Sequence, residues 1–186
     1  MGQCTDLSPS ELFEKFGPEG AKHEEFGMYI NDDRKKETPL ARLSFSFNAE
    51  DGTHALHQMQ RMFRNPEFGE FKVLSPIFAG KHPDNMLGYL HKRLNEKEIL
   101  KITKGFNVQT PSSYVQPGTL PVGPGIAYSE FADPKVTSHN GSRAAVVAEA
   151  IKAHRQHGGR VSLERCMDRA FHDAGYDHRK PWKVRE

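Results

Sequence analysis

The sequence lacks three features that would each assign it to a broad class of protein. Its two cysteines, Cys4 and Cys166, are too few for a disulfide framework and lack metal-site spacing, which favours a reducing compartment. Its apolar runs are far shorter than the roughly 20 residues that span a bilayer, so we expect no transmembrane segment. Charge of one sign is also lacking, since 26 Lys+Arg face 24 Asp+Glu. This balance predicts no general binding to nucleic acid, and any anion site must be local.

Residues 1–40 are predicted to form an N-terminal arm with one short helix beginning at Ser8, which has the features of an N-cap. A secretion segment, a chaperone-binding arm and a part of the fold are the three interpretations of this arm. Gly2 and Cys4 suggest attachment of myristate and palmitate, but Asp6 stands where the acylation motif has Ser or Thr. Acylation is therefore the weaker hypothesis.

The clearest strand is "ARLSFSFN", residues 41–48, in which apolar and polar side chains alternate. A helix follows after "EDG", and "GEFKVLS" is a further strand candidate. The segment "NMLGYLHKRL" fits a strand or a helix, and Gly88 and Tyr89 favour the strand; "EILKIT" is expected to pair with it or continue it. Because strands and helices are mixed without regular alternation, we expect a single α+β domain over residues 41–186. Its helices should pack on one side of a mainly antiparallel sheet, leaving the other side for a site.

The C-terminal part begins with a long Pro/Gly-rich loop over residues 105–124, a length that usually serves a function. The strand "GIAYSEF" follows, and then a helix that is expected to open at Arg143, with Ala144 and Ile151 on its buried face. The most regular helix lies between Ser162, its N-cap, and Gly175, its terminator.

Three segments in this part resemble the HopA1 effector family: "LPVGPGIAYSEF", "SRAAVVAEAI" and "AFHDAGYDHRKPW". That family covers type III effectors of plant pathogens and a related domain of lanthipeptide-making enzymes. The similarity spans residues 41–184 and is most specific toward the C-terminus. It implies an effector delivered into a host cell, where it acts on a host protein or phosphopeptide; the alternative is a bacterial cytoplasmic enzyme that acts on a precursor peptide.

The HopA1 family is in turn similar to phosphothreonine lyases, in which a strand lysine removes the proton alpha to the carbonyl and a histidine protonates the leaving phosphate. The resemblance places Lys72 at the lysine position. At the histidine position this sequence has Ser44, which cannot act as an acid near neutral pH. A non-catalytic binding protein that keeps the groove is therefore the competing hypothesis.

The residues that would carry this chemistry are predicted as follows. To act as the base, Lys72 must be neutral near pH 7. This requires a pKa that is lowered by burial or by neighbouring cations. Phosphate ligands are expected at Lys81, Arg42 and Arg143, the last because a helix N-terminus and a guanidinium both favour an anion. The loop residue His82 is the candidate acid in place of Ser44. Tyr89 is expected to line the phosphate pocket.

Each assignment has an ordinary structural alternative. Lys72 and His82 would then be solvated, Arg143 would form a surface salt bridge with Glu130 or Glu149, and Tyr89 would belong to the core. Nucleotide hydrolysis and nucleophilic catalysis have no support, because phosphate-cradling and nucleophile motifs are missing from the sequence, and no cofactor is expected. No metal site is expected either, because the two His pairs, 54/57 and 154/157, have no third ligand nearby in sequence.

Overall fold

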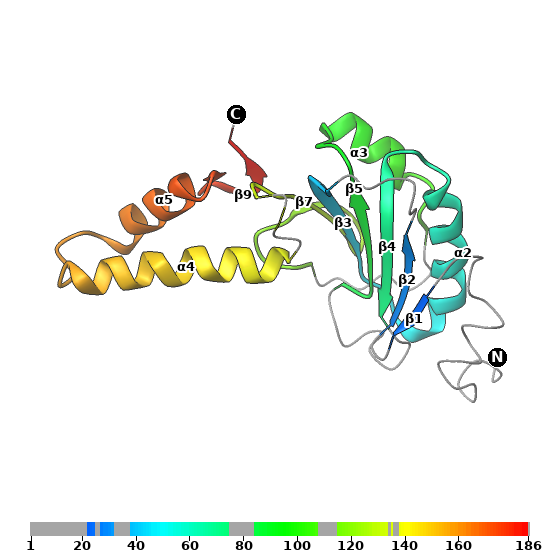
Figure 1. Ribbon diagram of the computed structural model, residues 1–186, viewed down its shortest axis with the longest axis horizontal. Helices are drawn as coiled ribbons and strands as arrows, with labels where there is room; N and C mark the ends of the chain where they lie inside the picture. The colour runs from blue at the N-terminus through cyan, green and yellow to red at the C-terminus, as the bar shows by residue number, and fades with distance from the viewer. Residues whose placement is uncertain are drawn as a thin grey trace.

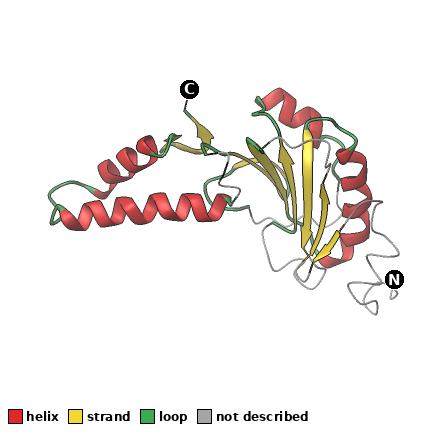
Figure 2. Ribbon diagram, viewed as in Figure 1, coloured by secondary structure: helices red, strands yellow, loops and turns green. Residues whose placement is uncertain are grey.

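The computed structural model describes residues 22–24, 27–31, 38–74, 84–107, 115–133, 135 and 138–185. They form an α+β structure around an antiparallel seven-stranded sheet, in the order β1-β2-β4-β5-β3-β7-β6, which confirms the expected fold class (Figures 1 and 2). Its strands are β1 (Lys22–Glu24), β2 (Gly27–Asn31), β3 (Ala41–Phe45), β4 (Phe68–Leu74), β5 (Met86–Leu90), β6 (Leu120–Gly123) and β7 (Ile126–Glu130). Because β1 and β2 belong to the sheet, it begins before residue 41.

One face of the sheet is covered by α2 (Gly52–Phe63) and α3 (Glu96–Thr103), which follow η1 (Ala49–Asp51) and β5 respectively (Figure 1). The apolar side chains of β3 that alternate in the sequence, Leu43 and Phe45, lie in this core together with Met59 and Ile99. The alternation therefore sends Arg42 and Ser44 to the other face, because successive strand side chains point to opposite sides.

The segment "EILKIT" is helix α3, so the expectation that it pairs with or extends the preceding strand was wrong. The helix starts there because Asn95 and Glu98 form a capping box: the Asn95 side chain accepts from the Glu98 backbone N–H at 3.0 Å, and the Glu98 carboxylate accepts from the Asn95 N–H at 2.9 Å. The strand before it, β5, ends at Leu90, so the second half of the strand candidate "NMLGYLHKRL" does not continue the strand.

The last part of the chain forms an arm that projects away from the sheet (Figure 1). It consists of α4 (His139–Gln156) and α5 (Leu163–Asp173), followed by a small hairpin of β8 (Tyr176–Asp177) and β9 (Lys180–Val184). The two helices pack through their own apolar cluster, which includes Val146, Phe171 and Tyr176. Helix α5 runs between the predicted Ser162 cap and Gly175, which has a positive φ of 82°.

Helix α4 begins one turn earlier than expected. Ser138 is its N-cap and accepts a hydrogen bond from the Gly141 N–H at 3.2 Å, so Arg143 lies beyond the first turn. The predicted buried stripe was also wrong in part, because Ala144 and Ile151 are exposed whereas Val146 and Ala150 are buried. The reason is that α4 packs only against α5 along most of its length, so a single face is covered.

Candidate functional site

The residues predicted to bind phosphate on the sheet lie in two cross-strand rows. Arg42 on β3 pairs in register with Tyr89 on β5 and with Ser129 on β7, and Tyr89 pairs with Glu70 on β4. Directly paired residues of antiparallel strands point to the same side. This row therefore lies on the face away from α2 and α3.

The second row contains the residues that the lyase resemblance singles out. Lys72 pairs with Leu87, and Leu87 pairs with Ser44. Lys72 is half-buried, whereas Ser44 is buried and its hydroxyl donates to the Ala127 carbonyl at 3.4 Å. Lys72 is two strands from β3, roughly 10 Å at ordinary strand spacing. The two rows thus bring Lys72, Tyr89 and Arg42 to one face.

Arg42 is only 3% exposed, which is unusual for a charged side chain. Its Nη2 donates to the Oε1 of Gln116, while its Nε is buried and has no hydrogen-bond partner. Burial lowers the pKa of Arg42, and so does the nearby Arg143 guanidinium; Tyr89 and Asp84 act in the opposite direction. The fold therefore holds a buried cation whose Nε–H is left to bind an acceptor.

Arg143 is buried as well, and each nitrogen of its guanidinium donates a hydrogen bond to a protein group. Its Nη2 and Nε donate to the carbonyls of Glu130 and Pro181, both at 2.8 Å, and its Nη1 donates to the Ser142 hydroxyl at 3.0 Å. The guanidinium carbon lies 3.6 Å from the centre of the Tyr176 ring. Arg143 thus joins β7, α4 and the terminal hairpin, in place of the surface salt bridge considered from the sequence.

His139 is a residue of this region that sequence reasoning missed. It is the first residue of α4, it is fully buried, and its Nε2 lies 3.1 Å from the Pro117 carbonyl. Burial, followed by the charges of Arg42 and Arg143, lowers its pKa to about 3. The signal that could have found it is Ser138, a good N-cap residue directly before it. Instead the helix was expected to open at Arg143, which left His139 in a loop.

Four buried polar atoms without a hydrogen-bond partner come from side chains of this region. We call these side chains the buried polar cluster: Arg42 (Nε), Gln116 (Nε2), Ser129 (Oγ) and His139 (Nδ1). Gln116 bonds to Arg42, Ser129 is the cross-strand partner of Arg42, and the charge of Arg42 acts on His139. Because protein interiors leave few polar atoms unpaired, such a concentration marks a place where a ligand or an ordered water completes the bonding.

The remaining predicted residues have different outcomes. Lys81 and His82 lie outside the described residues. Glu70, a residue that the sequence analysis did not single out, lies on the same face as Lys72; burial raises its pKa, and the Lys72 charge partly counteracts this. The lyase-type acid and base and all of the phosphate-binding roles thus stay predictions.

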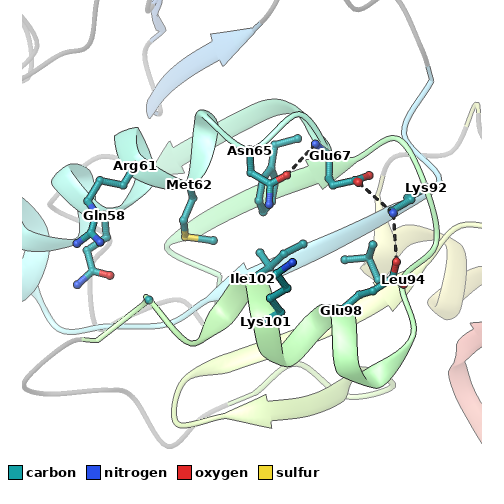
Figure 3. Close-up of a pocket in the computed structure, with 12 residues that line it drawn as sticks. Gln58, Arg61, Met62, Asn65, Glu67, Lys92, Leu94, Glu98, Lys101 and Ile102 are labelled. Atoms are coloured by element: carbon teal, nitrogen blue, oxygen red, sulfur yellow. Dashed lines mark hydrogen bonds and ion pairs between the residues drawn. The ribbon is translucent and has the colours of Figure 1, made fainter.

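Figure 3 shows a separate cleft of about 500 Å³ between α2 and α3, on the helix-covered side of the sheet. Apolar side chains such as Met62 and Ile102 line it together with charged ones. Its Lys92 is bonded to Glu67 at 3.0 Å and to Glu98 at 3.1 Å. Because these carboxylates neutralise the lysine, the cleft is a poorer anion site than the buried polar cluster.

The sequence matches the model of the HopA1 effector protein family over residues 19–183. The chain belongs to this family. The match begins before residue 41 and therefore includes the strands β1 and β2. No helix in the described part of this HopA1 family member is long and apolar enough to cross a membrane.

Comparisons with individual proteins agree on the fold. HrmA of Pseudomonas syringae pv. syringae is 26% identical over 167 residues, which cover 84% of this chain and 41% of HrmA. The chain therefore spans less than half the length of this curated relative. The solved structure of an effector protein from Pseudomonas syringae pv. tomato strain DC3000 has a TM-score of 0.75 at 17% identity, covering 94% of this chain and 67% of the other.

A more remote structural similarity is found to the type III effector and phosphothreonine lyase OspF of Shigella flexneri. It has a TM-score of 0.41 at 8% identity and covers 66% of this chain and 76% of OspF. This is the distant similarity that the sequence resemblance implied. At this level it assigns no role to any residue here.

Proposed function

We propose that this chain is a HopA1-type effector domain with a phosphate or phosphopeptide site centred on Arg42. The observation that carries the proposal is the buried Arg42 guanidinium, whose Nε has no partner, with a second buried guanidinium, Arg143, near enough to lower its pKa. A tetrahedral phosphate group is the ligand that best offsets two neighbouring guanidinium groups, because it is anionic and accepts several N–H donors at once.

The position of Lys72 supports a lyase-type reaction at this site. In that reaction the Lys72 amine takes the proton from the Cα of a phosphothreonine or phosphoserine, the Cβ–O bond breaks, and the phosphate leaves with the bonding electrons. A Cα=Cβ double bond remains in the peptide. Lys72 and Arg42 share one face of the sheet, separated by the width of β5, so a peptide lying across β5 would place its phosphate toward Arg42 and its Cα toward Lys72.

A second candidate function is phosphopeptide binding without chemistry. The observation that favours it is Ser44, which stands at the acid position and is buried with its hydroxyl bonded to the Ala127 carbonyl. In either case the natural ligand that we propose is a host protein, reached by delivery of the effector into the host cell.

Incubation with a phosphothreonine peptide separates the two functions. The lyase predicts loss of phosphoric acid from the peptide by mass spectrometry, and this loss should disappear in Lys72→Ala. The control is Lys101→Ala, an exposed lysine on α3, which should behave as wild type. Binding of the peptide without any mass loss would reject the lyase and support the binding module. A protein that neither binds nor converts the peptide would reject both.

A further inference from the structure

The tautomer of His139 is determined by its neighbour. The Pro117 carbonyl is a hydrogen-bond acceptor, so the Nε2 that lies 3.1 Å from it carries the proton. A neutral imidazole has one protonated nitrogen, and a pKa of about 3 keeps this ring neutral near pH 7. Nδ1 is therefore an unprotonated acceptor, and it is buried without a partner.

The other unpaired atoms of the buried polar cluster are mainly donors. The Arg42 Nε and the Gln116 Nε2 both carry hydrogens and accept nothing, while the Ser129 hydroxyl can donate or accept. The Gln116 side chain is oriented by its own carbonyl, which accepts from Arg42. A ligand that satisfies the whole cluster must therefore present acceptor oxygens together with one O–H donor.

We propose that the buried polar cluster binds a phosphate group in its monoprotonated form, with the P–OH donating to His139 Nδ1. The inference rests on the proposed phosphate site and names the form of the ligand that the site selects. Sulfate near neutral pH has acceptor oxygens but no proton, so it would leave Nδ1 facing an oxygen lone pair. Such a mismatch of a buried acceptor is costly.

The proton on the bound phosphate also changes the need for a catalytic acid, which Ser44 cannot supply. A phosphomonoester held as R–O–PO₃H⁻ releases hydrogen phosphate when the Cβ–O bond breaks, and the bond's electron pair stays on the leaving oxygen. Without the bound proton, the same step would release the phosphate trianion. His139 would thus act as a positioning residue that keeps the proton on the phosphate, and no separate acid would be required.

Calorimetric titration of the protein with inorganic phosphate, a phosphothreonine peptide and inorganic sulfate tests the proposal. We expect phosphate and the phosphopeptide to bind at least about tenfold more tightly than sulfate, the value of one well-placed charged hydrogen bond.

The charges that face His139 are Arg42 from β3 and Arg143 from α4, and neither loses its proton near pH 8. Titrations at pH 8 in buffers of different ionisation enthalpy should therefore show uptake of about one proton per bound phosphopeptide, because the free phosphomonoester, with its second pKa near 6, is then a dianion.

His139→Gln is the matched variant: its amide nitrogen can keep the bond to the Pro117 carbonyl, while its acceptor, the amide oxygen, is attached to the terminal carbon and no longer stands at the Nδ1 position. It should lose both the preference over sulfate and the proton uptake; His57→Gln, an exposed site on α2, should keep both. Equal affinity of the wild-type protein for phosphate and sulfate, or binding without proton uptake, would overturn this inference and leave the proposed phosphate site standing. Failure to bind any of the three anions would overturn both and identify the cluster as a site for buried water.

Discussion

The guanidinium of Arg143 stacks on the ring of Tyr176, with 3.6 Å between the guanidinium carbon and the ring centre. This contact connects α4 to the hairpin that ends the chain, and the bonds from Arg143 to the carbonyls of Glu130 and Pro181 connect both to the sheet. Arg143 is therefore one of the anchors of the arm, together with the bond from the Val184 N–H to the Glu130 carboxylate, and it lies next to the cluster that we propose as the phosphate site.

Arg143→Ala is expected to lower the free energy of unfolding by about 3 kcal/mol, because hydrogen bonds from a charged group and a desolvated cation–π contact are lost together. Urea denaturation followed by circular dichroism measures this. Arg155→Ala, an exposed position on α4, should change stability by less than about 0.5 kcal/mol. An Arg143→Ala protein of wild-type stability that has lost phosphate binding would instead favour a ligand role over the anchoring role.

Stability should fall in acid because of His139. Its pKa is about 3 in the folded protein and near 6.5 when unfolded, so the unfolded state binds more protons between these values. The contribution is therefore present above about pH 6.5 and is lost as the pH falls toward about 3, with a total of a few kcal/mol. Urea denaturation at pH 7 and pH 5 should show a smaller decrease for His139→Gln than for wild type. Equal decreases in the two proteins would contradict this account.

Arg42→Met tests whether Arg42 is kept for function rather than for stability. Replacing a buried charge by an apolar side chain of similar length removes its desolvation cost, which offsets the lost hydrogen bond to Gln116, so we expect little net loss of stability in the absence of phosphate. Wild type should gain about 2.7 kcal/mol at phosphate concentrations 100-fold above its Kd, and Arg42→Met should gain nothing. Thermal denaturation with and without phosphate measures both effects. The control is Arg61→Met, at an exposed position on α2, which should keep the gain.

Asn95→Ala should destabilise the protein by about 1 kcal/mol, because it removes the side chain that caps α3. Only one half of the capping box is lost directly, and the Glu98 carboxylate can still accept from the backbone N–H of residue 95. Chemical denaturation measures the change. Wild-type stability in Asn95→Ala would mean that the packing of Ile99 in the core, and not the cap, determines where α3 begins.

Much of the fold was predictable because its signals are local. The alternation in residues 41–48 predicted β3 and its buried Leu43 and Phe45, but the polar face that was expected to stay open is buried as well. The positions of α2 and α5 also followed from apolar spacing and from caps. The prediction failed for "EILKIT", where the apolar pattern of a short segment fits a strand as well as a helix, and the capping box at Asn95 decided the outcome.

The properties of the candidate site also divide into those that the sequence predicts and those that only the tertiary structure reveals. The sequence by itself determined that Arg42, Tyr89 and Lys72 lie on strands, at positions expected on the polar face. This was possible because the alternation of apolar and polar residues and the family motifs are both recognised from residues close together in the chain. Only the tertiary structure decided that Arg42 is buried, that Gln116 and His139 meet it, and that four polar atoms there lack partners. The reason is physical: strand register and the contacts that the start of α4 makes beside the sheet bring together residues far apart in the chain, and burial, which sets their charge and their bonding, exists only after that packing.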